Sequence, residues 1–193
     1  LQNNDWCPTQ EQFANTSATE QFFSGQGAMF FAGSWDLANL CSTYTDMNGK
    51  WDVAVLPKCP NPESGDGRAV ISNSVSYATA AEGKNKDTAM DFLKFLASEE
   101  GQRIQGESGV AIPAYNGLED TWVNTFAENG YDIHPENIIP MFDYSVKYVN
   151  NPSRPSWEPK VEQAVLDIYA GNMSVDDGIQ NMQDIVTEAI AEE

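Results

Sequence analysis

The stretch of residues 22–35 constrains the fold of this chain more than any other segment. It ends a helix, turns at two glycines, continues through the apolar residues 28–31 and reaches Trp35 just after Gly33. Glycine adopts the positive φ angles that such turns need, and a short apolar run is typical of a strand buried on both faces. The pattern predicts a strand over 28–32 and a sharp exit at Gly33, which turns the Trp35 ring into a cleft or into a neighbouring core.

Hydrophobic periodicity predicts alternating helices and strands along the next part of the chain. Helices are expected over residues 16–24 and 35–44. Strands are expected over 51–56 and 69–79, with a turn rich in proline and glycine between them. A further helix is expected to present one apolar face, formed by Ala89, Phe92, Leu93, Leu96 and Ala97.

The last third of the chain is predicted to hold two helices. Ser156 is the expected N-cap of the first, which carries Trp157 and tolerates Pro159 in its first turn, and Gly171 ends it. Ser174 is expected to cap the final helix, with an acidic residue three positions later as in a capping box. The core stripe of this final helix is predicted to be Ile179, Met182, Ile185, Val186, Ala189 and Ile190.

The charge of the chain excludes one large class of partners. Ten basic residues against 29 acidic residues give a formal net charge of −19. Binding to nucleic acid phosphates needs clustered lysine and arginine, and an anionic membrane surface would repel this chain. The acidic residues are dispersed, so we attribute them to solubility rather than to recognition of cations.

The cysteine and histidine content does not predict a metal or a cofactor. In an exported protein Cys41 and Cys59 could form a disulfide, but we favour free thiols. Zinc is not expected, since there is no Cys-x-x-Cys spacing and His134 is the only histidine.

The sequence does not predict an enzyme. His134 lies in a loop-like context without a Gly-x-Ser-x-Gly elbow, so we expect an exposed loop histidine. No phosphate-cradling loop or dinucleotide fingerprint is present. A pair of catalytic carboxylates for glycoside hydrolysis stays an open alternative in a chain with 29 acids, although nothing marks two of them as facing each other.

Features in a fixed order along most of the chain resemble the extracellular solute-binding proteins that serve sugar ABC importers. No single one is specific, and the resemblance depends on their order. They are the elbow 33–35, the strand ending at Leu56-Pro57, the strand over 69–80, the helix and turn over 89–101 with Gly109 and Pro113 following, and Trp157 before a final amphipathic helix.

The resemblance implies an α/β fold, the two-lobe fold of type II periplasmic-binding-protein-like proteins. This chain would be the carboxy-terminal half of such a protein. Residues 1–70 would belong to the second lobe, residues 71–119 to a crossing strand and a helical part of the first lobe, and residues 120–193 to the second lobe again. The segment 71–119 would then lack the amino-terminal sheet that covers its apolar stripe, leaving Leu93 and Leu96 exposed unless another chain or a rearrangement covers them.

The resemblance also implies a non-enzymatic carbohydrate-binding site in an interlobe cleft. Trp35 and Trp157 match positions where the family carries aromatic rings that stack on sugars. The other residues expected to bind the ligand are Gly33, Ser34, Asp36, Ser72, Asn73, Tyr144 and Arg154.

Partners and location are expected from the same resemblance. The partners would be a mono- or oligosaccharide, the ABC permease and the missing amino-terminal half of the protein. The location would be extracellular, as a membrane-anchored lipoprotein, or periplasmic; the sequence starts without a signal peptide or lipobox cysteine, which fits a trimmed chain or a fragment. A glycoside-active enzyme and a cell-surface carbohydrate-binding module without transport are the alternative functions.

Overall fold

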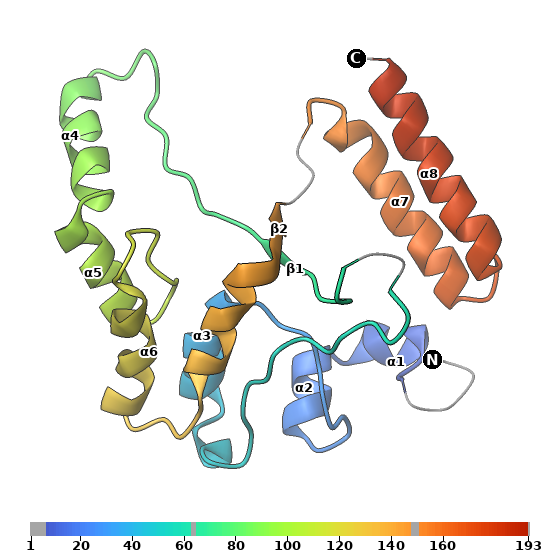
Figure 1. Ribbon diagram of the computed structural model, residues 1–193, viewed down its shortest axis with the longest axis horizontal. Coiled ribbons are helices and arrows are strands. Elements are labelled where there is room, and N and C mark those ends of the chain that lie inside the picture. Colours follow the sequence, from blue (N-terminus) through green and yellow to red (C-terminus); the bar gives the residue numbers. More distant parts are fainter. Residues whose placement is uncertain (1–6, 63–64, 148–150, 193) are drawn as a thin grey trace. The chain divides into compact units, whose positions relative to one another are not determined.

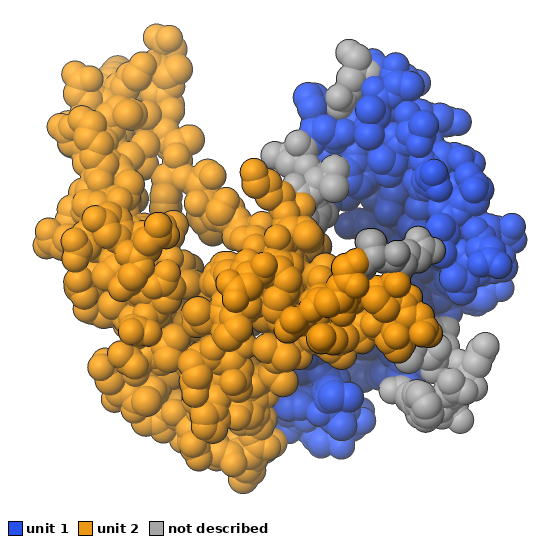
Figure 2. All heavy atoms as spheres, in the orientation of Figure 1, with its two compact units in different colours: residues 1–30, 148–193 blue, residues 31–147 orange. Residues whose placement is uncertain are grey.

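The computed structural model describes residues 7–62, 65–147 and 151–192. The chain divides into two compact units, which are coloured separately in Figure 2. Unit 1 comprises residues 1–30 and 148–193, and unit 2 comprises residues 31–147. Both units are mainly helical in the part of the chain that the structure describes (Figure 1).

Unit 1 contains two short helices from the start of the chain and two long helices from its end. The predicted helix over 16–24 is confirmed as α2, whose N-cap Ser17 forms a capping box with Glu20. Both hydrogen bonds of this capping box are present: the Glu20 amide donates to Ser17 Oγ, and the Ser17 amide donates to Glu20 Oε2. The helices are α1 (Gln10–Asn15), α2 (Ala18–Phe23), α7 (Arg154–Tyr169) and α8 (Val175–Ala191).

Helices α7 and α8 pack side by side as a helical hairpin (Figure 1). The predicted N-cap of α8 is confirmed, since the Asp177 amide donates to Ser174 Oγ at 3.1 Å. Gly171 has positive φ just beyond the end of α7, as its predicted role as a stop signal requires. The predicted stripe of α8 is confirmed only in part: Met182, Ile185, Val186 and Ala189 are half-buried, whereas Ile179 and Ile190 are exposed.

The predicted start of α7 at Ser156 is wrong. The helix begins one turn earlier, at Arg154, with Ser153 as its N-cap. The Ser156 hydroxyl donates instead to the Ser153 carbonyl at 2.7 Å, inside the first turn. Pro159 therefore lies beyond the first turn, where its missing amide leaves a carbonyl of the preceding turn without its usual helical partner.

The apolar run 28–32 is not a strand, although its sequence predicts one. Phe30 packs against α2 instead, with ring centroids 5.0 Å from Phe22 and 6.4 Å from Phe23. Met29 and Phe31 are exposed. A strand is stable only when neighbouring backbone groups pair with its amides and carbonyls, and among the described residues only β1 and β2 form such a ladder.

Unit 2 carries four α-helices, three 3₁₀ segments and two strands among its described residues. The predicted helix over 35–44 is confirmed as a 3₁₀ turn followed by α3, and the helix predicted over 89–97 is confirmed as α4. The elements are η2 (Ser34–Asp36), α3 (Leu37–Thr43), η3 (Thr45–Met47), β1 (Val70–Ser72), α4 (Lys86–Leu96), α5 (Glu99–Glu107), α6 (Glu119–Glu128), η4 (Pro135–Tyr144) and β2 (Ser145–Lys147).

The core of unit 2 forms where α3 meets α6. Trp122 is fully buried, and its ring meets that of Phe126 edge to face with centroids 5.1 Å apart. The indole Nε1–H donates to the Gly109 carbonyl at 3.0 Å, so the buried polar group is satisfied. The buried members of this core are Leu37, Cys41, Trp122, Phe126 and Ile133.

Helices α5 and α6 approach each other closely at Gly106. A Cβ atom at this position would collide with the hydroxyl of Thr121, so the packing requires glycine. Thr125 of α6 donates its hydroxyl to the carbonyl of Glu107 at 2.8 Å, which fixes the end of α5. Helix α5 itself was not predicted, since the segment 89–101 was expected to hold a helix and its following turn. The chain turns at Gly109, which has a φ of +71°, as the resemblance implied.

The strands are much shorter than predicted. β1 pairs with β2 in parallel, with Val70 opposite Ser145 and Ser72 opposite Lys147, whereas the prediction extended over 69–79. The segment predicted as a strand over 51–56 has no ladder. Of the predicted α/β architecture, the described residues therefore contain the helices and one small parallel sheet.

The apolar face of α4 is not closed into a core. No residue of α4 is buried, and Phe92 is 58% exposed. Phe92 and Phe95 stack on each other, with centroids 6.4 Å apart, and both remain open to solvent. The expectation that Leu93 and Leu96 would be left open is met in part, since both are half-buried.

Candidate ligand-binding site

The turn at residues 33–36 presents Trp35 on the surface of unit 2. The Asp36 amide donates to the Gly33 carbonyl at 3.0 Å, and the Leu37 amide donates to the Ser34 carbonyl. Leu37 is only 3% exposed and anchors the end of the turn in the core, whereas Trp35 is 57% exposed. The turn therefore leaves most of the indole available to a ligand.

The predicted reason for glycine at position 33 needs correction. Gly33 has φ −90° and ψ 155°, an extended conformation that any residue adopts. The sharp exit comes from the 3₁₀ turn that starts at Ser34, so it does not depend on the conformational freedom of Gly33. Ser34 and Asp36, which flank the indole in sequence, are both half-buried.

Ser72, Asn73 and Tyr144 lie at the small parallel sheet. Ser72 ends β1, Asn73 follows it, and both are exposed. Tyr144 immediately precedes β2, whose Ser145 pairs with the first residue of β1. Tyr144 and Ser72 are therefore about three residues apart along the ladder, or about 10 Å at the usual rise of a strand. The structure thus brings together two groups that the sequence placed 72 positions apart.

Arg68 orients Tyr144, and sequence reasoning missed it. The guanidinium carbon lies 4.9 Å from the centroid of the Tyr144 ring, within the range of a cation–π contact. Asp66 also holds the guanidinium, accepting from Arg68 Nε at 2.7 Å. This hydrogen bond lowers the pKa of Asp66 and raises that of Arg68. The only sequence signal was an aspartate two residues before an arginine in a turn.

Arg154 and Trp157 belong to α7 in unit 1. Trp157 is 8% exposed, and its Nε1–H donates to Asn151 Oδ1 at 3.0 Å. Arg154 forms an ion pair with Glu158 one turn further along the helix, with Nη2 and Oε1 2.7 Å apart. The indole is therefore largely a packing group of unit 1 in this structure. That Trp157 and Trp35, which lie in different units, face one cleft stays a prediction.

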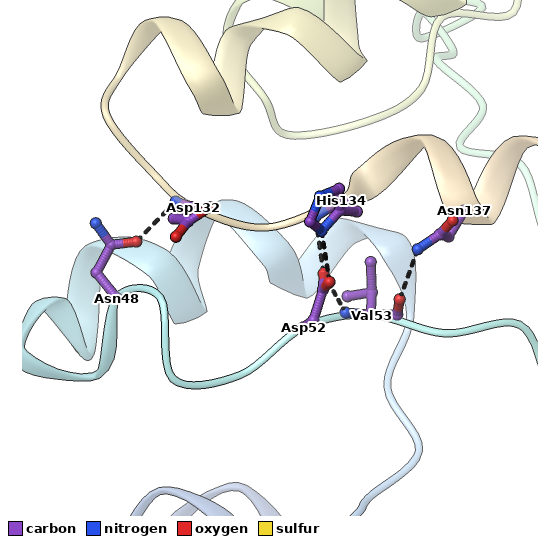
Figure 3. A network of polar contacts seen from close by, with 6 residues as sticks. All are labelled: Asn48, Asp52, Val53, Asp132, His134 and Asn137. Atoms are coloured by element: carbon purple, nitrogen blue, oxygen red, sulfur yellow. Dashed lines mark hydrogen bonds and ion pairs between the residues drawn. The ribbon is translucent and has the colours of Figure 1, made fainter.

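His134 joins two segments of unit 2 that are about 80 residues apart (Figure 3). The amide of His134 donates to Asp52 Oδ1 at 2.7 Å, and Nδ1 of its ring lies 2.6 Å from Asp52 Oδ2. The side chain of His134 is exposed, as predicted. The hydrogen bond that the His134 ring donates to Asp52, and the negative charge of Asp52, raise the pKa of His134.

The pKa of Asp52 shifts in the opposite direction to that of His134. Partial burial would raise its pKa, but hydrogen bonds from the amides of His134 and Val53, together with the His134 ring, outweigh burial and lower it. Asn48 and Asn137 extend the network: Asn48 Oδ1 accepts from the amide of Asp132, and Asn137 Nδ2 donates to the Val53 carbonyl (Figure 3). We call these contacts the 52–134 staple. Its geometry gives His134 a structural role.

A hollow of about 640 Å³ lies between α5 and α6 in unit 2. Tyr115 is its one aromatic side chain, and none of the predicted ligand-binding residues lines it. Small-molecule sites usually combine apolar walls with a few polar groups, whereas this hollow is dominated by acids. Its carboxylates are those of Glu99, Glu107, Asp120 and Glu128.

The cysteines are free in this structure. Cys41 is buried in the core of unit 2, and burial raises its pKa to about 11, so it stays a thiol at neutral pH. Cys59 is exposed. Across residues 7–62, 65–147 and 151–192 there is no group of three or more histidine, cysteine or acidic side chains placed to hold a metal ion. None of the described helices has the length and apolar character needed to cross a membrane.

Comparison with known families identifies the class of protein. A family model described as bacterial extracellular solute-binding protein matches residues 5–103, just over half of the chain. The chain therefore belongs to the bacterial extracellular solute-binding protein family. A search of curated proteins found no match.

Membership of this family indicates the general fold, location and role of the protein. The family has a periplasmic-binding-protein-like fold, is extracellular or periplasmic, and supplies the solute-binding component of transporters. Its members typically bind their solutes without converting them. The match includes the Trp35 turn, the Asp52 side of the staple, β1 and α4.

Proposed function

We propose that this protein is the carbohydrate-binding component of an ABC importer. It captures a mono- or oligosaccharide and delivers it to a membrane permease. Family membership supports solute binding for transport. The observation that carries the choice of sugar is the exposed indole of Trp35, held on a hydrogen-bonded turn next to the hydrophobic core.

The chemistry of a sugar explains why an exposed indole suits it. One face of a pyranose ring presents C–H groups, which pack on a flat aromatic surface, while its hydroxyls require hydrogen-bonding partners. Ser34 and Asp36 flank Trp35 and provide a hydroxyl and a carboxylate in this proposal. No tryptophan is among the residues that line the acidic hollow between α5 and α6, so the hollow offers no exposed indole with polar neighbours.

The remaining ligand-binding residues come from the sheet and from α7. Ser72 and Asn73 offer exposed polar side chains at the end of β1, and Tyr144 is oriented beside that strand by Arg68. Arg154 and Trp157 complete the proposed site from unit 1. Trp157 would contribute the small exposed part of its ring, since its Nε1–H already has a protein partner.

We further propose that the complete protein has two lobes and that this chain is its carboxy-terminal half. Residues 1–70 and 120–193 belong to the second lobe in this proposal, and residues 71–119 to the first. The support is the apolar face of α4, on which Phe92 and Phe95 are exposed. Burying a side chain of this size is worth about 1.5–3 kcal/mol, so an amino-terminal half that covered the face would be stabilised by it.

The proposed partners and location follow from the transport role. The sugar-loaded protein docks on the transmembrane subunits of the permease, outside the cytoplasmic membrane. We propose either a lipid anchor or a periplasmic location, in keeping with the extracellular or periplasmic location of the family.

Isothermal titration calorimetry of the intact protein tests the proposal. The ligand panel contains glucose, galactose, maltose, cellobiose and xylobiose, with amino acids and a dipeptide as non-sugar controls. Saturable binding of at least one sugar, and not of the controls, supports the proposal. If only an amino acid or the dipeptide binds, the proposed ligand is wrong and the solute belongs to that other class.

The same sugars are then incubated with the protein and analysed for hydrolysis. We expect each bound sugar to be recovered unchanged. Release of shorter sugars at the concentration of protein used would establish a glycoside-active enzyme instead.

A further inference from the structure

We propose that Gly33 is a positioning residue for the sugar platform: its missing side chain is the space that the Trp35 indole occupies. This inference rests on the proposed function, because the platform matters only if the indole binds the ligand. It gives Gly33, which the resemblance implied as a ligand-binding residue, a different role: Gly33 acts through Trp35 rather than by touching the sugar.

The indole lies directly against Gly33. A Cβ atom built on Gly33 would stand 2.5 Å from Cη2 of Trp35, and closer still to Cε2 and Cζ2. Cβ contacts under 3.0 Å are essentially never found in real structures, so an alanine here would force something to shift. All three atoms belong to the six-membered ring of the indole.

The backbone conformation of Gly33 does not require glycine. Its φ of −90° and ψ of 155° are open to any residue. The requirement is therefore steric, and the three atoms nearest to the added Cβ all belong to the ring of Trp35. A substitution at this position should leave the turn in place and act on the ring.

The ring moves more easily than the turn. The turn is held by two backbone hydrogen bonds, from Asp36 to Gly33 and from Leu37 to Ser34, and by the buried side chain of Leu37. Trp35 is 57% exposed, so solvent offers its ring another rotamer. Gly33→Ala is therefore expected to swing the indole away from its present position while the chain stays folded.

Gly27 provides a matched control. It also lacks positive φ, and a Cβ atom built on it would meet its nearest neighbours at 3.8 Å, an ordinary contact. Gly27→Ala makes the same substitution six positions earlier in the chain, where the nearest atoms belong to Gln21 and Phe22. It should leave the indole and the affinity for sugar unchanged.

The ring position is measured without any ligand. The full chain is labelled with 5-fluorotryptophan, and the Trp35 signal among the five tryptophans is assigned by its loss in Trp35→Phe. Gly33→Ala is expected to shift the Trp35 ¹⁹F signal and leave the others in place, whereas Gly27→Ala leaves all of them in place. If the Trp35 signal does not shift in Gly33→Ala, the inference is wrong, regardless of the results of the sugar-binding measurements.

Affinity is measured by a double-mutant cycle with the sugar that the panel identifies. Gly33→Ala is expected to weaken binding at least about tenfold when Trp35 is present, and less than about twofold in the Trp35→Phe background. Phenylalanine has no counterpart of Cζ2 and Cη2, so most of the clash is absent there. Equal losses in both backgrounds overturn the inference.

Two further outcomes separate the possible failures. If Gly33→Ala unfolds alone but folds in the Trp35→Phe background, the clash is still established; unfolding in both backgrounds contradicts it. If no sugar in the panel binds the wild-type protein, the proposed function fails, while the ¹⁹F result still decides whether Gly33 positions the ring.

Discussion

Replacing Trp35 with alanine removes the indole that the turn at residues 33–36 exposes. Trp35 is 57% exposed and contributes little to the core, so Trp35→Ala should change the free energy of unfolding by less than about 1 kcal/mol. Its effect should appear in binding. The variant therefore separates the stability of the chain from the affinity of the site.

The loss of affinity can be estimated from the area that a stacked sugar would cover. An indole and a pyranose ring bury about 100 Å² of apolar surface between them, which at about 25 cal/mol per Å² gives roughly 2–3 kcal/mol. This corresponds to a 30- to 150-fold increase in Kd, to order of magnitude. Trp35→Phe should lose less, because a smaller aromatic surface remains.

Calorimetry with the sugar identified in the panel measures the change on the intact protein. Tyr115→Ala is the matched control, since Tyr115 is 43% exposed in the same unit and lines the acidic hollow. It should leave Kd unchanged. Equal affinities for wild type and Trp35→Ala would rule out the platform, and a loss confined to Tyr115→Ala would transfer the site to the hollow.

Three further predictions concern the fold that carries the site. Hydrogen exchange over 89–97 should be rapid in the isolated monomeric chain, because α4 buries no residue; strong protection would contradict this. Trp122→Ala should lower the free energy of unfolding in urea by about 3–5 kcal/mol, and a loss under about 1 kcal/mol would contradict the core described above. The 52–134 staple should stabilise the chain most between the ordinary pKa values of its two groups, 3.8 and 6.5. Asp52→Asn should therefore lower the melting temperature most within this window, and an equal difference at pH 8 would contradict the charged pairing.

The sign of this pH dependence follows from the two shifts. The pKa of His134 is raised by Asp52, so its contribution is present below 6.5 and is lost as the pH rises through the raised value. Glu136 and Asp132 act on His134 in the same direction. The pKa of Asp52 is lowered, so its contribution is present above 3.8 and is lost as the pH falls through the lowered value.

Local signals in the sequence predicted five of the eight described α-helices, namely α2, α3, α4, α7 and α8, and missed α1, α5 and α6. Ser174 caps α8 as expected, and the 3.6-residue period located α4. The Asp177 carboxylate accepts from the Ser174 hydroxyl rather than from the amide that a capping box would use. The error at α7 is a shift of one turn. Ser153, three residues before the predicted Ser156, is the N-cap, and Pro155 is compatible with the first turn of a helix that starts at Arg154.

The strands were predicted less well because a strand depends on its partner. The run 28–32 has the composition of a buried strand, but composition cannot supply the neighbouring backbone groups. Near 51–56, side chains satisfy part of the backbone instead: Asp52 accepts from the Val53 amide, and Asn137 donates to the Val53 carbonyl. The Asn137 contact joins residues 84 positions apart, which no local pattern predicts.

The candidate site was predicted in the same uneven way. The turn that exposes Trp35 is local, and the sequence indicates it. The Arg68 contact with Tyr144 depends on the pairing of β1 with β2, and the steric role of Gly33 depends on the rotamer of Trp35. Neither could be derived from spacing along the chain.

A crystal structure of the intact protein with its sugar bound tests the central claim most directly. We predict that a pyranose ring stacks on the Trp35 indole, with carbon atoms about 3.5–4.0 Å from the ring, and that Trp157 contacts the same ligand. A sugar bound in the hollow between α5 and α6, or anywhere without contact to Trp35, would contradict the account.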